Sequence, residues 1–303
     1  MRNGLHVHLL HNPKAGDQDP IKDGLINTIE SHGFTCQYAS IKDKRWKRFR
    51  SDTGLVVIAG GDGTVREVMK KLLKRRVLDR RLTVALLPSG TANNFAKTLG
   101  ISTALADFER SLAGWNTKKI DVGAIENLRD AQFFMEGMGC GLIPRLITEM
   151  KALDTAKIRT AEEELQVALG KLLEISEDYR AKRATVAIDG RVYEDDYLLV
   201  EILNIRSVGP NLILAPDASP ADGKFEVVLL KEADRSAFAD TVRRLKRGSH
   251  PGTAVPWNTV TAMHEVTIRC ENRLVHVDDE LITHKKGKVI RIEMRRGIID
   301  MIT

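Results

Sequence analysis

A run of five residues, Gly60-Gly61-Asp62-Gly63-Thr64, combines the residue types that bind phosphate groups. Glycines permit positive φ angles and let phosphate oxygens approach backbone N–H groups closely. The run follows an apolar segment at 54–59 and precedes apolar residues at helical spacing, so it would lie at a helix N-terminus, where anions are favoured. Asp62 could orient a metal-bound water or a ribose hydroxyl, and Thr64 could donate to a phosphate. The pattern favours binding of a nucleoside triphosphate, as in a kinase.

The same run also has a purely structural explanation, in which Asp62 and Thr64 only cap the helix that follows. It lacks the Gly-Lys-Ser/Thr ending of a Walker loop and the spacing of a dinucleotide-binding GxGxxG motif. Two further turns favour the functional interpretation, because each also follows a predicted strand: residues 12–16 and residues 88–93. Lys14 could meet a phosphate as a point charge, and Thr91 could reach one from a helix start.

These turns lie between alternating strand and helix patterns in the first part of the chain. Strands are predicted at 5–10, 34–40, 54–59 and 82–87, and helices over 21–29, 65–73 and 92–99. This alternation predicts a mostly parallel α/β sheet, whose ligands bind at the carboxyl ends of the strands.

The pattern changes after 119–122. A helical block with apolar residues from Ile158 to Leu173 is followed by several strand-like stretches between 184 and 294, separated by turns such as Asp189-Gly190. We therefore predict a nucleotide-binding α/β domain at 1–122 and a second, mostly antiparallel β domain at 123–294.

Composition narrows the class of protein. The chain has 303 residues, 43% of them apolar and 29% charged, as in globular proteins. The net charge of +6 suits contact with phosphates or an anionic membrane surface, and equally an ordinary solvated surface. Cys36, Cys140 and Cys270 are widely spaced, so neither a disulfide framework nor a zinc site is predicted and a reducing cytoplasm is expected. Without a signal peptide or an apolar run of ~20 residues, any membrane contact would be peripheral.

A basic run at 42–50 carries two aromatic residues, Trp46 and Phe49. It could contact anionic lipid headgroups with its aromatics at the interface. We favour the alternative, a surface helix whose aromatic face packs inward. Nucleic-acid binding is not expected, because no binding motif accompanies the charge.

Taken in order, the three turns resemble the diacylglycerol kinase catalytic-domain family. The motifs are Asn-Pro-x-x-Gly, then Gly-Gly-Asp-Gly-Thr-x-x-Glu, then Pro-Ser-Gly-Thr-Ala-Asn, and the later segments 119–123, 222–227 and 277–280 fit as well. The chain is most similar to the soluble bacterial lipid kinases, which are related to sphingosine and ceramide kinases and, more distantly, to NAD kinases.

The resemblance implies an ATP- and Mg²⁺-dependent lipid kinase that transfers the γ-phosphoryl group to a hydroxyl of a membrane lipid such as diacylglycerol, at the inner face of the membrane. It implies a C-terminal β-sandwich domain that contacts the lipid, with the chain end 295–303 returning to the first domain. The implied nucleotide-binding residues, of which Asp121 belongs to a magnesium–water network, are Asn12, Pro13, Lys14, Ala15, Gly16, Ser40, Gly60, Gly61, Asp62, Gly63, Thr64, Glu67, Thr91 and Asp121.

Two acidic segments are further implied to carry chemistry. Asp278 and Glu280 would be the catalytic acids, because transfer to a hydroxyl needs a carboxylate that accepts its proton. Asp222 would hold a structural Mg²⁺ together with the carbonyls of Ser219 and Lys224. Without the resemblance, both segments are typical of solvated turns.

Three positions depart from the family pattern. Asn94 stands where an Asp is usual, Arg66 where an Asn is usual, and Asp279 where a Gly is usual, which places a third negative charge beside the candidate base. Two other functions stay open: an NAD kinase-like enzyme, which shares Gly-Gly-Asp-Gly, and a lipid- or nucleotide-binding protein with weakened catalysis. The acceptor could be diacylglycerol, a sphingoid base, ceramide or phosphatidylglycerol, because lipid contacts carry no short motif.

Overall fold

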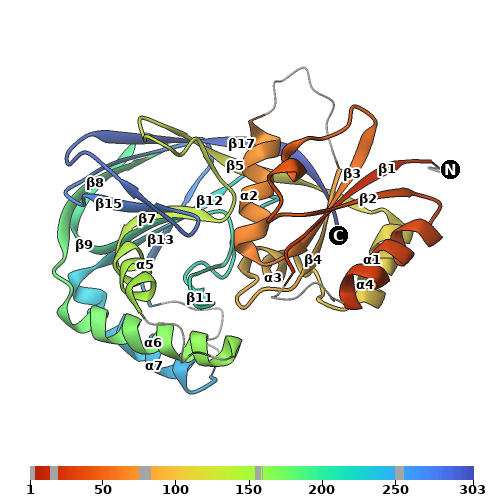
Figure 1. The fold of residues 1–303 in the computed structure, drawn as a ribbon. Coiled ribbons are helices and arrows are strands. Elements are labelled where there is room, and N and C mark those ends of the chain that lie inside the picture. The colour runs from red at the N-terminus through yellow and green to blue at the C-terminus, as the bar shows by residue number, and fades with distance from the viewer. Residues whose placement is uncertain (1–3, 14–19, 75–82, 154–157, 159, 250–255) are drawn as a thin grey trace. The chain divides into compact units, whose positions relative to one another are not determined.

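A computed structural model describes residues 4–13, 20–74, 83–153, 158, 160–249 and 256–303 of the chain (Figure 1). The chain divides into two compact units. The first comprises Met1–Ile120 together with Gly297–Thr303, and the second comprises Asp121–Arg296. Two strands, β5 (Thr117–Glu126) and β17 (Val289–Ile302), continue from one unit into the other.

The first unit is built on a parallel sheet with the strand order β17–β4–β3–β1–β2. The end of β17 pairs with the start of β4, so the last residues of the chain complete this sheet. The other elements of this unit are β1 (His6–His11), α1 (Pro20–Ser31), β2 (Thr35–Ser40), η1 (Lys44–Lys47), β3 (Thr53–Gly60), α2 (Asp62–Leu73), β4 (Thr83–Pro88), α3 (Asn94–Leu99) and α4 (Leu105–Gly114).

Helices cover both faces of this sheet, which explains why its central strand is a continuous apolar run. Every residue of β3 is buried. Val7 and Leu9 of β1 pack with Leu25 of α1 and Phe108 of α4. Figure 1 shows α1 and α4 on one side of the sheet and α2 on the other. Burial on both faces is the usual state of parallel strands.

The second unit is antiparallel, with the order β16–β15–β7–β9–β8–β14–β17. β9 also pairs with β12, which pairs with β13, and β5 pairs with β6. The elements that belong to this unit are β6 (Phe133–Phe134), β7 (Gly137–Gly141), α5 (Leu142–Ala152), α6 (Ala161–Asp178), β8 (Lys182–Ile188), β9 (Arg191–Leu203), β10 (Ser207–Val208), β11 (Leu212–Ile213), β12 (Phe225–Lys231), η3 (Glu232–Asp234), α7 (Arg235–Lys246), β13 (Asn258–Ala262), β14 (Glu265–Cys270), β15 (Leu274–Val277) and β16 (Glu280–Thr283).

Successive residues of β9 enter two different cores. Val200 and Ile202 belong to a cluster in the interior of the sandwich, formed by strands together with Ala131 of the loop before β6. Leu199 and Leu203 belong to a second cluster, which includes side chains of α5, α6 and α7 such as Phe238. The sheet around β9 therefore packs against other strands on one face and against helices on the other.

The predicted fold class is confirmed: a mostly parallel N-terminal α/β unit and a C-terminal antiparallel β-sandwich. Some elements differ from the prediction. Ile158 precedes α6, which begins at Ala161 after a capping box of Thr160 and Glu163. The sequence reasoning did not include α7, and the basic run forms only the short 3-10 helix η1.

Candidate functional site

Four parallel strands of the first unit end side by side at one edge of their sheet. The register pairs His11 with Ser40 and Ala59, and Gly60 with Pro88. A pocket of about 380 Å³ lies at this edge, and its walls come from the residues that follow the strands and from the first turns of α2: Asn12, Ile41, Gly60, Gly61, Gly63, Thr64, Glu67, Ser89 and Gly90. Because α/β proteins bind ligands at the carboxyl ends of their strands, this pocket is the candidate nucleotide site.

Three glycines of this pocket, Gly60, Gly61 and Gly90, leave no room for a side chain because of close contacts. A Cβ atom on Gly61 would lie 2.8 Å from the Gly90 Cα, and one on Gly90 would lie 2.5 Å from the Gly61 Cα. A Cβ on Gly60 would lie 2.6 Å from the Thr64 Oγ1. None of these glycines has a positive φ, so the conformational reason expected from the sequence is wrong for them and close approach replaces it.

Asp62 joins the starts of two helices. Its Oδ2 accepts a hydrogen bond from the Asn94 N–H at 3.0 Å, and its Oδ1 accepts one from the Phe95 N–H at 3.4 Å. These N–H groups belong to the first turn of α3, where no intrahelical acceptor is available. The capping role considered for Asp62 is therefore real, but Asp62 caps α3, whereas its own helix α2 has Gly61 at the N-cap.

Asn12 and Thr64 connect the loops after β1 and β3. The Asn12 Nδ2 donates to the Thr64 Oγ1 at 3.2 Å, and the Asn12 N–H donates to the Ala59 carbonyl at 3.0 Å. Glu67 lies on the same wall, with its Oε1 3.5 Å from the Lys47 Nζ. Of the first predicted turn, Pro13 is described but does not line the pocket, and Lys14, Ala15 and Gly16 lie outside the described residues.

Two other predicted residues lie near the pocket without lining it. Ser40 ends β2, and its Oγ accepts the Lys42 N–H, while Thr91 is exposed. Their neighbours Ile41 and Gly90 form the wall instead. Sequence reasoning did not select Ile41, although it directly follows a predicted strand, and that position is the signal that could have found it.

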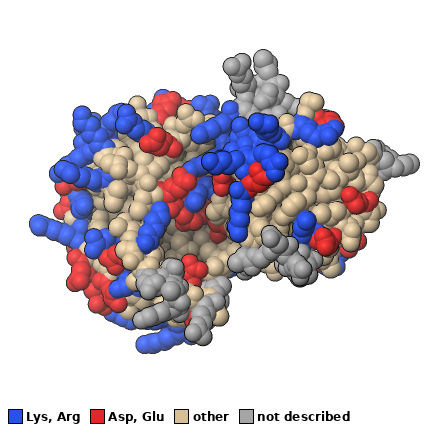
Figure 2. All heavy atoms as spheres, viewed as in Figure 1, with Lys and Arg blue, Asp and Glu red and all other residues tan. Residues whose placement is uncertain are grey.

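The basic run does not present its aromatic residues to a membrane. Trp46 is 1% exposed, and its ring lies edge-on to that of Phe49, which in turn meets His8 inside the unit. The preferred interpretation, inward-packed aromatics, is confirmed. Basic side chains instead gather over α2 (Figure 2), which carries Arg66, Lys70 and Lys71.

In the second unit, Asp278 holds a hairpin in place. Asp278 and Asp279 form the two-residue turn between β15 and β16. The Asp278 Oδ1 accepts hydrogen bonds from three consecutive backbone N–H groups, those of Met135 at 3.2 Å, Glu136 at 2.9 Å and Gly137 at 3.3 Å. Asp278 has φ +50°, which Asp tolerates. Asp279 stands where the family usually has a glycine, but its φ is not positive, so the backbone does not require a glycine there. Glu280 begins β16 and is partly exposed.

A buried acid–base pair lies directly behind this hairpin. Glu201 is 0% and His276 is 1% exposed, and the His276 Nε2 lies 2.7 Å from the Glu201 Oε1. The His276 Nδ1 bonds the carbonyl of Asp278 at 2.5 Å. Burial lowers the pKa of His276, but the charge and the hydrogen bond of Glu201 outweigh it and raise this pKa to about 9. Sequence reasoning missed the pair, although a glutamate inside the apolar run 198–203 was a usable signal.

The predicted metal-binding segment forms a turn beside Asp121. Asp121 is buried, and its Oδ2 accepts the Gly223 N–H at 2.7 Å. The Asp222 Oδ1 accepts the Lys224 N–H at 3.0 Å. Burial and, more weakly, the charge of Asp121 raise the pKa of Asp222. The two carboxylates, Asp121 and Asp222, give this turn a negative charge that suits a cation. Ser219, the other predicted ligand, is partly exposed. Within the described ranges, however, no group of three His, Cys, Asp or Glu side chains is placed to hold a metal ion.

Comparison with known proteins agrees with this architecture. The family model of the diacylglycerol kinase catalytic domain matches residues 6–125, and that of the YegS C-terminal NAD kinase beta sandwich-like domain matches residues 150–300. The chain belongs to the diacylglycerol kinase catalytic-domain family. It is 27% identical over 255 residues to a diacylglycerol kinase of Bacillus subtilis, covering 80% of each chain, and 23% identical over 254 residues to one of Staphylococcus carnosus, covering 80% of this chain and 78% of that one.

A solved structure shows the same fold. The crystal structure of a diacylglycerol kinase from Bacillus anthracis str. Sterne superposes with a TM-score of 0.72 at 24% identity, covering 98% of this chain and 96% of that chain. Among the helices that the structure describes, none is both long and apolar enough to span a membrane.

Proposed function

We propose that this protein is a lipid kinase that transfers the γ-phosphoryl group of ATP, with Mg²⁺, to a hydroxyl of a membrane lipid such as diacylglycerol. The observation that carries the proposal is the glycine-lined pocket at the carboxyl ends of four parallel strands. The pocket fits phosphate groups because its walls lack side chains at Gly60, Gly61 and Gly90, where any Cβ would meet another loop or Thr64. Membership of the family and the names of its relatives support the same activity.

Residues of this pocket would bind and orient the triphosphate. Gly63 lines it in the first turn of α2, and the N-terminus of a helix favours anions through the helix dipole. Mg²⁺ would neutralise phosphate charge, and in proteins it is usually bound through one or two carboxylates and substrate phosphates. Glu67 is the carboxylate on the pocket wall that could supply such a ligand.

The lipid hydroxyl oxygen would attack the γ-phosphorus while the bond to the β-phosphate oxygen breaks, and a carboxylate would take the hydroxyl proton. We assign the role of proton acceptor to Glu280, which is partly exposed. Asp278 is buried and its Oδ1 already accepts three N–H bonds, so Asp278 would position the hairpin that carries Glu280. The cationic side chains over α2 would attract an anionic membrane surface.

The pocket can be tested with a matched pair of glycine variants. In Gly61→Ala, the added Cβ must displace the Gly90 loop, and a misplacement of about 1 Å can reduce transfer ~100-fold. In Gly114→Ala, the Cβ meets only the Asn116 Nδ2, at 3.5 Å, so transfer should stay near the unmodified rate. The measurement is transfer of radiolabelled phosphate from ATP to a total lipid extract. Equal transfer by both variants would contradict the assigned site.

The catalytic assignment needs a second pair. Glu280→Gln should abolish transfer and leave the melting temperature unchanged, whereas Asp278→Asn should lower the melting temperature because it weakens three hydrogen bonds. NAD is offered as an acceptor in parallel, since labelled NAD phosphate with unlabelled lipid would show an NAD kinase. ATP binding without transfer to any acceptor would show a binding protein.

A further inference from the structure

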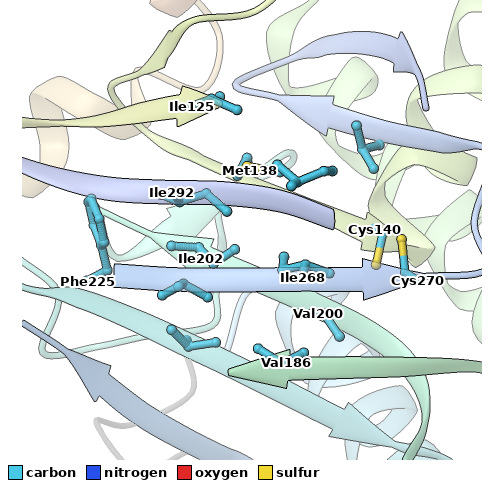
Figure 3. Packing of buried hydrophobic residues seen from close by; sticks show 14 of the residues in the cluster. Ile125, Met138, Cys140, Val186, Val200, Ile202, Phe225, Ile268, Cys270 and Ile292 are labelled. Carbon is cyan, nitrogen blue, oxygen red and sulfur yellow. The ribbon is translucent and has the colours of Figure 1, made fainter. Parts of the chain in front are cut away.

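Two of the three cysteines meet inside the second unit. Cys140 is the second-last residue of β7 and Cys270 is the last residue of β14, and both are at most 3% exposed. Figure 3 shows the two sulfur atoms side by side at the end of the strand-lined core. They share a hydrogen bond between their side chains. The strands are three pairings apart in the sheet order, so the contact arises because the sheet folds back on itself.

The pair lies next to a cleft of about 490 Å³ in the same unit. Gly141 and Asn272, which lie one and two residues beyond the cysteines, line this cleft. Tyr179 and Lys182 line it as well, and the Tyr179 hydroxyl accepts a hydrogen bond from the Asn272 Nδ2 at 2.8 Å. Neither cysteine lines the cleft itself, so a molecule as small as hydrogen peroxide that enters it reaches residues one and two positions along the chain from the two cysteines.

We propose that Cys140 and Cys270 are a redox-active dithiol, which hydroperoxides oxidise to an intramolecular disulfide between β7 and β14. Nothing in the lipid kinase reaction requires these residues, so the modification site is independent of the proposed function. The disulfide would connect two strands that are not neighbours in the sheet, at the points where α5 begins and where β14 turns toward β15.

The two thiols have different roles because their surroundings differ. The Cys140 thiol donates its hydrogen bond to the Cys270 sulfur, which lowers the pKa of Cys270 against the effect of burial, and the Asn272 N–H and the Lys182 charge lower it further. The same hydrogen bond, together with burial, raises the pKa of Cys140. Cys270 is therefore the nucleophile, because the thiolate is the reactive form, and Cys140 is the resolving thiol.

The reaction balances in two steps. The Cys270 thiolate attacks one oxygen of hydrogen peroxide, the O–O bond breaks, and a sulfenic acid and hydroxide form. The Cys140 sulfur then attacks the Cys270 sulfur, the S–S bond forms as the S–O bond breaks, and water leaves with the Cys140 proton. Two thiols lose two electrons in total, and one peroxide becomes two water molecules.

Cys36 provides an internal comparison. It lies in β2 of the first unit, and burial raises its pKa to about 11, so it should react slowly. In the full chain carrying Cys36→Ser, hydrogen peroxide should remove both remaining thiols and lower the mass by two hydrogens, and dithiothreitol should reverse the change. Peptide mapping should find Cys140 joined to Cys270.

Single variants separate the two roles. With Cys140→Ala, Cys270 should form a sulfenic acid that dimedone traps, because no resolving thiol remains. With Cys270→Ala, Cys140 should react far more slowly. Lys182→Met should slow the first step several-fold and shift the pH dependence of its rate to higher pH. Lys182→Arg, which retains the positive charge, should leave both the rate and its pH dependence unchanged. Thiols that persist under peroxide, irreversible oxidation of Cys270 while Cys140 is present, or faster reaction of Cys140 than of Cys270 would each overturn the proposal.

Discussion

The buried pair of Glu201 and His276 should control how the stability of the second unit depends on pH. Both side chains are almost fully buried, and the two hydrogen bonds between them measure 2.7 and 2.9 Å. The pKa of His276 is raised from 6.5 to about 9, mainly by Glu201 acting against burial. At 1.36 kcal/mol per pH unit, the His276 shift alone corresponds to about 3 kcal/mol, but burial also raises the pKa of Glu201, so the buried carboxylate costs part of this gain.

The sign of the effect follows from proton binding. Because the folded protein holds the His276 proton more tightly than the unfolded chain, this stabilisation is complete below pH 6.5 and is lost as the pH rises through about 9. The free energy of unfolding, measured by urea titration with circular dichroism, should therefore fall across this window. In Glu201→Gln this fall in the free energy of unfolding should be absent, because the neutral amide does not stabilise the positive charge of protonated His276.

A second variant isolates the cost of an unpaired buried charge. His276→Ala leaves the Glu201 carboxylate buried without its partner and should cost about 3–5 kcal/mol at pH 7. The control is Glu194→Gln. It removes an exposed carboxylate of the strand that carries Glu201, paired with Arg183 of the neighbouring β8, and should change the free energy of unfolding by less than ~1 kcal/mol. If Glu201→Gln keeps the alkaline loss of stability, or if His276→Ala costs no more than the control, the reasoning is refuted.

Two further predictions concern other charged or titratable groups. His8 is fully buried, and neither of its ring nitrogens has a hydrogen-bond partner among the described residues. Burial and the charge of His6 lower the pKa of His8 to about 4, so the protein should lose stability as the pH falls from 6.5 to 4. His8→Leu should remove part of that loss, as measured by acid titration of the unfolding midpoint. If Mg²⁺ binds at Asp222, it should raise the melting temperature, and Asp222→Asn should abolish the increase while Asp217→Asn keeps it. An equal response to Mg²⁺ in both variants would exclude a site at Asp222.

The sequence was sufficient for features that depend on local order along the chain. A parallel sheet brings the end of every strand to one edge, so three turns that each follow a strand had to meet there, and the pocket contains residues from all three. Ser40 and Thr91 show the limit of this reasoning. Strand ends could be predicted to within one or two residues, but which of two neighbours faces the pocket depends on the exact register.

Features that depend on contacts between distant segments could not be predicted. The Glu201–His276 pair joins residues 75 positions apart, and Asp278 bonds backbone groups more than 140 positions away. Cys140 and Cys270 looked unrelated for the same reason, since their contact requires the fold of the whole sheet. The sequence shows which side chain stands at each position, but the order of the strands in the sheet determines which distant residue it contacts.

The two interpretations of Asp62, a helix cap and a phosphate-site residue, describe the same structure. By accepting the N–H groups of Asn94 and Phe95, Asp62 fixes the start of α3 to the start of α2. Asn93 then bonds both backbone groups of Gly90, and Gly90 touches Gly61. The cap thus maintains the contact between the two glycine loops that form the pocket. Loss of the Asp62 carboxylate should impair phosphate binding through loop geometry even if Asp62 never touches the nucleotide.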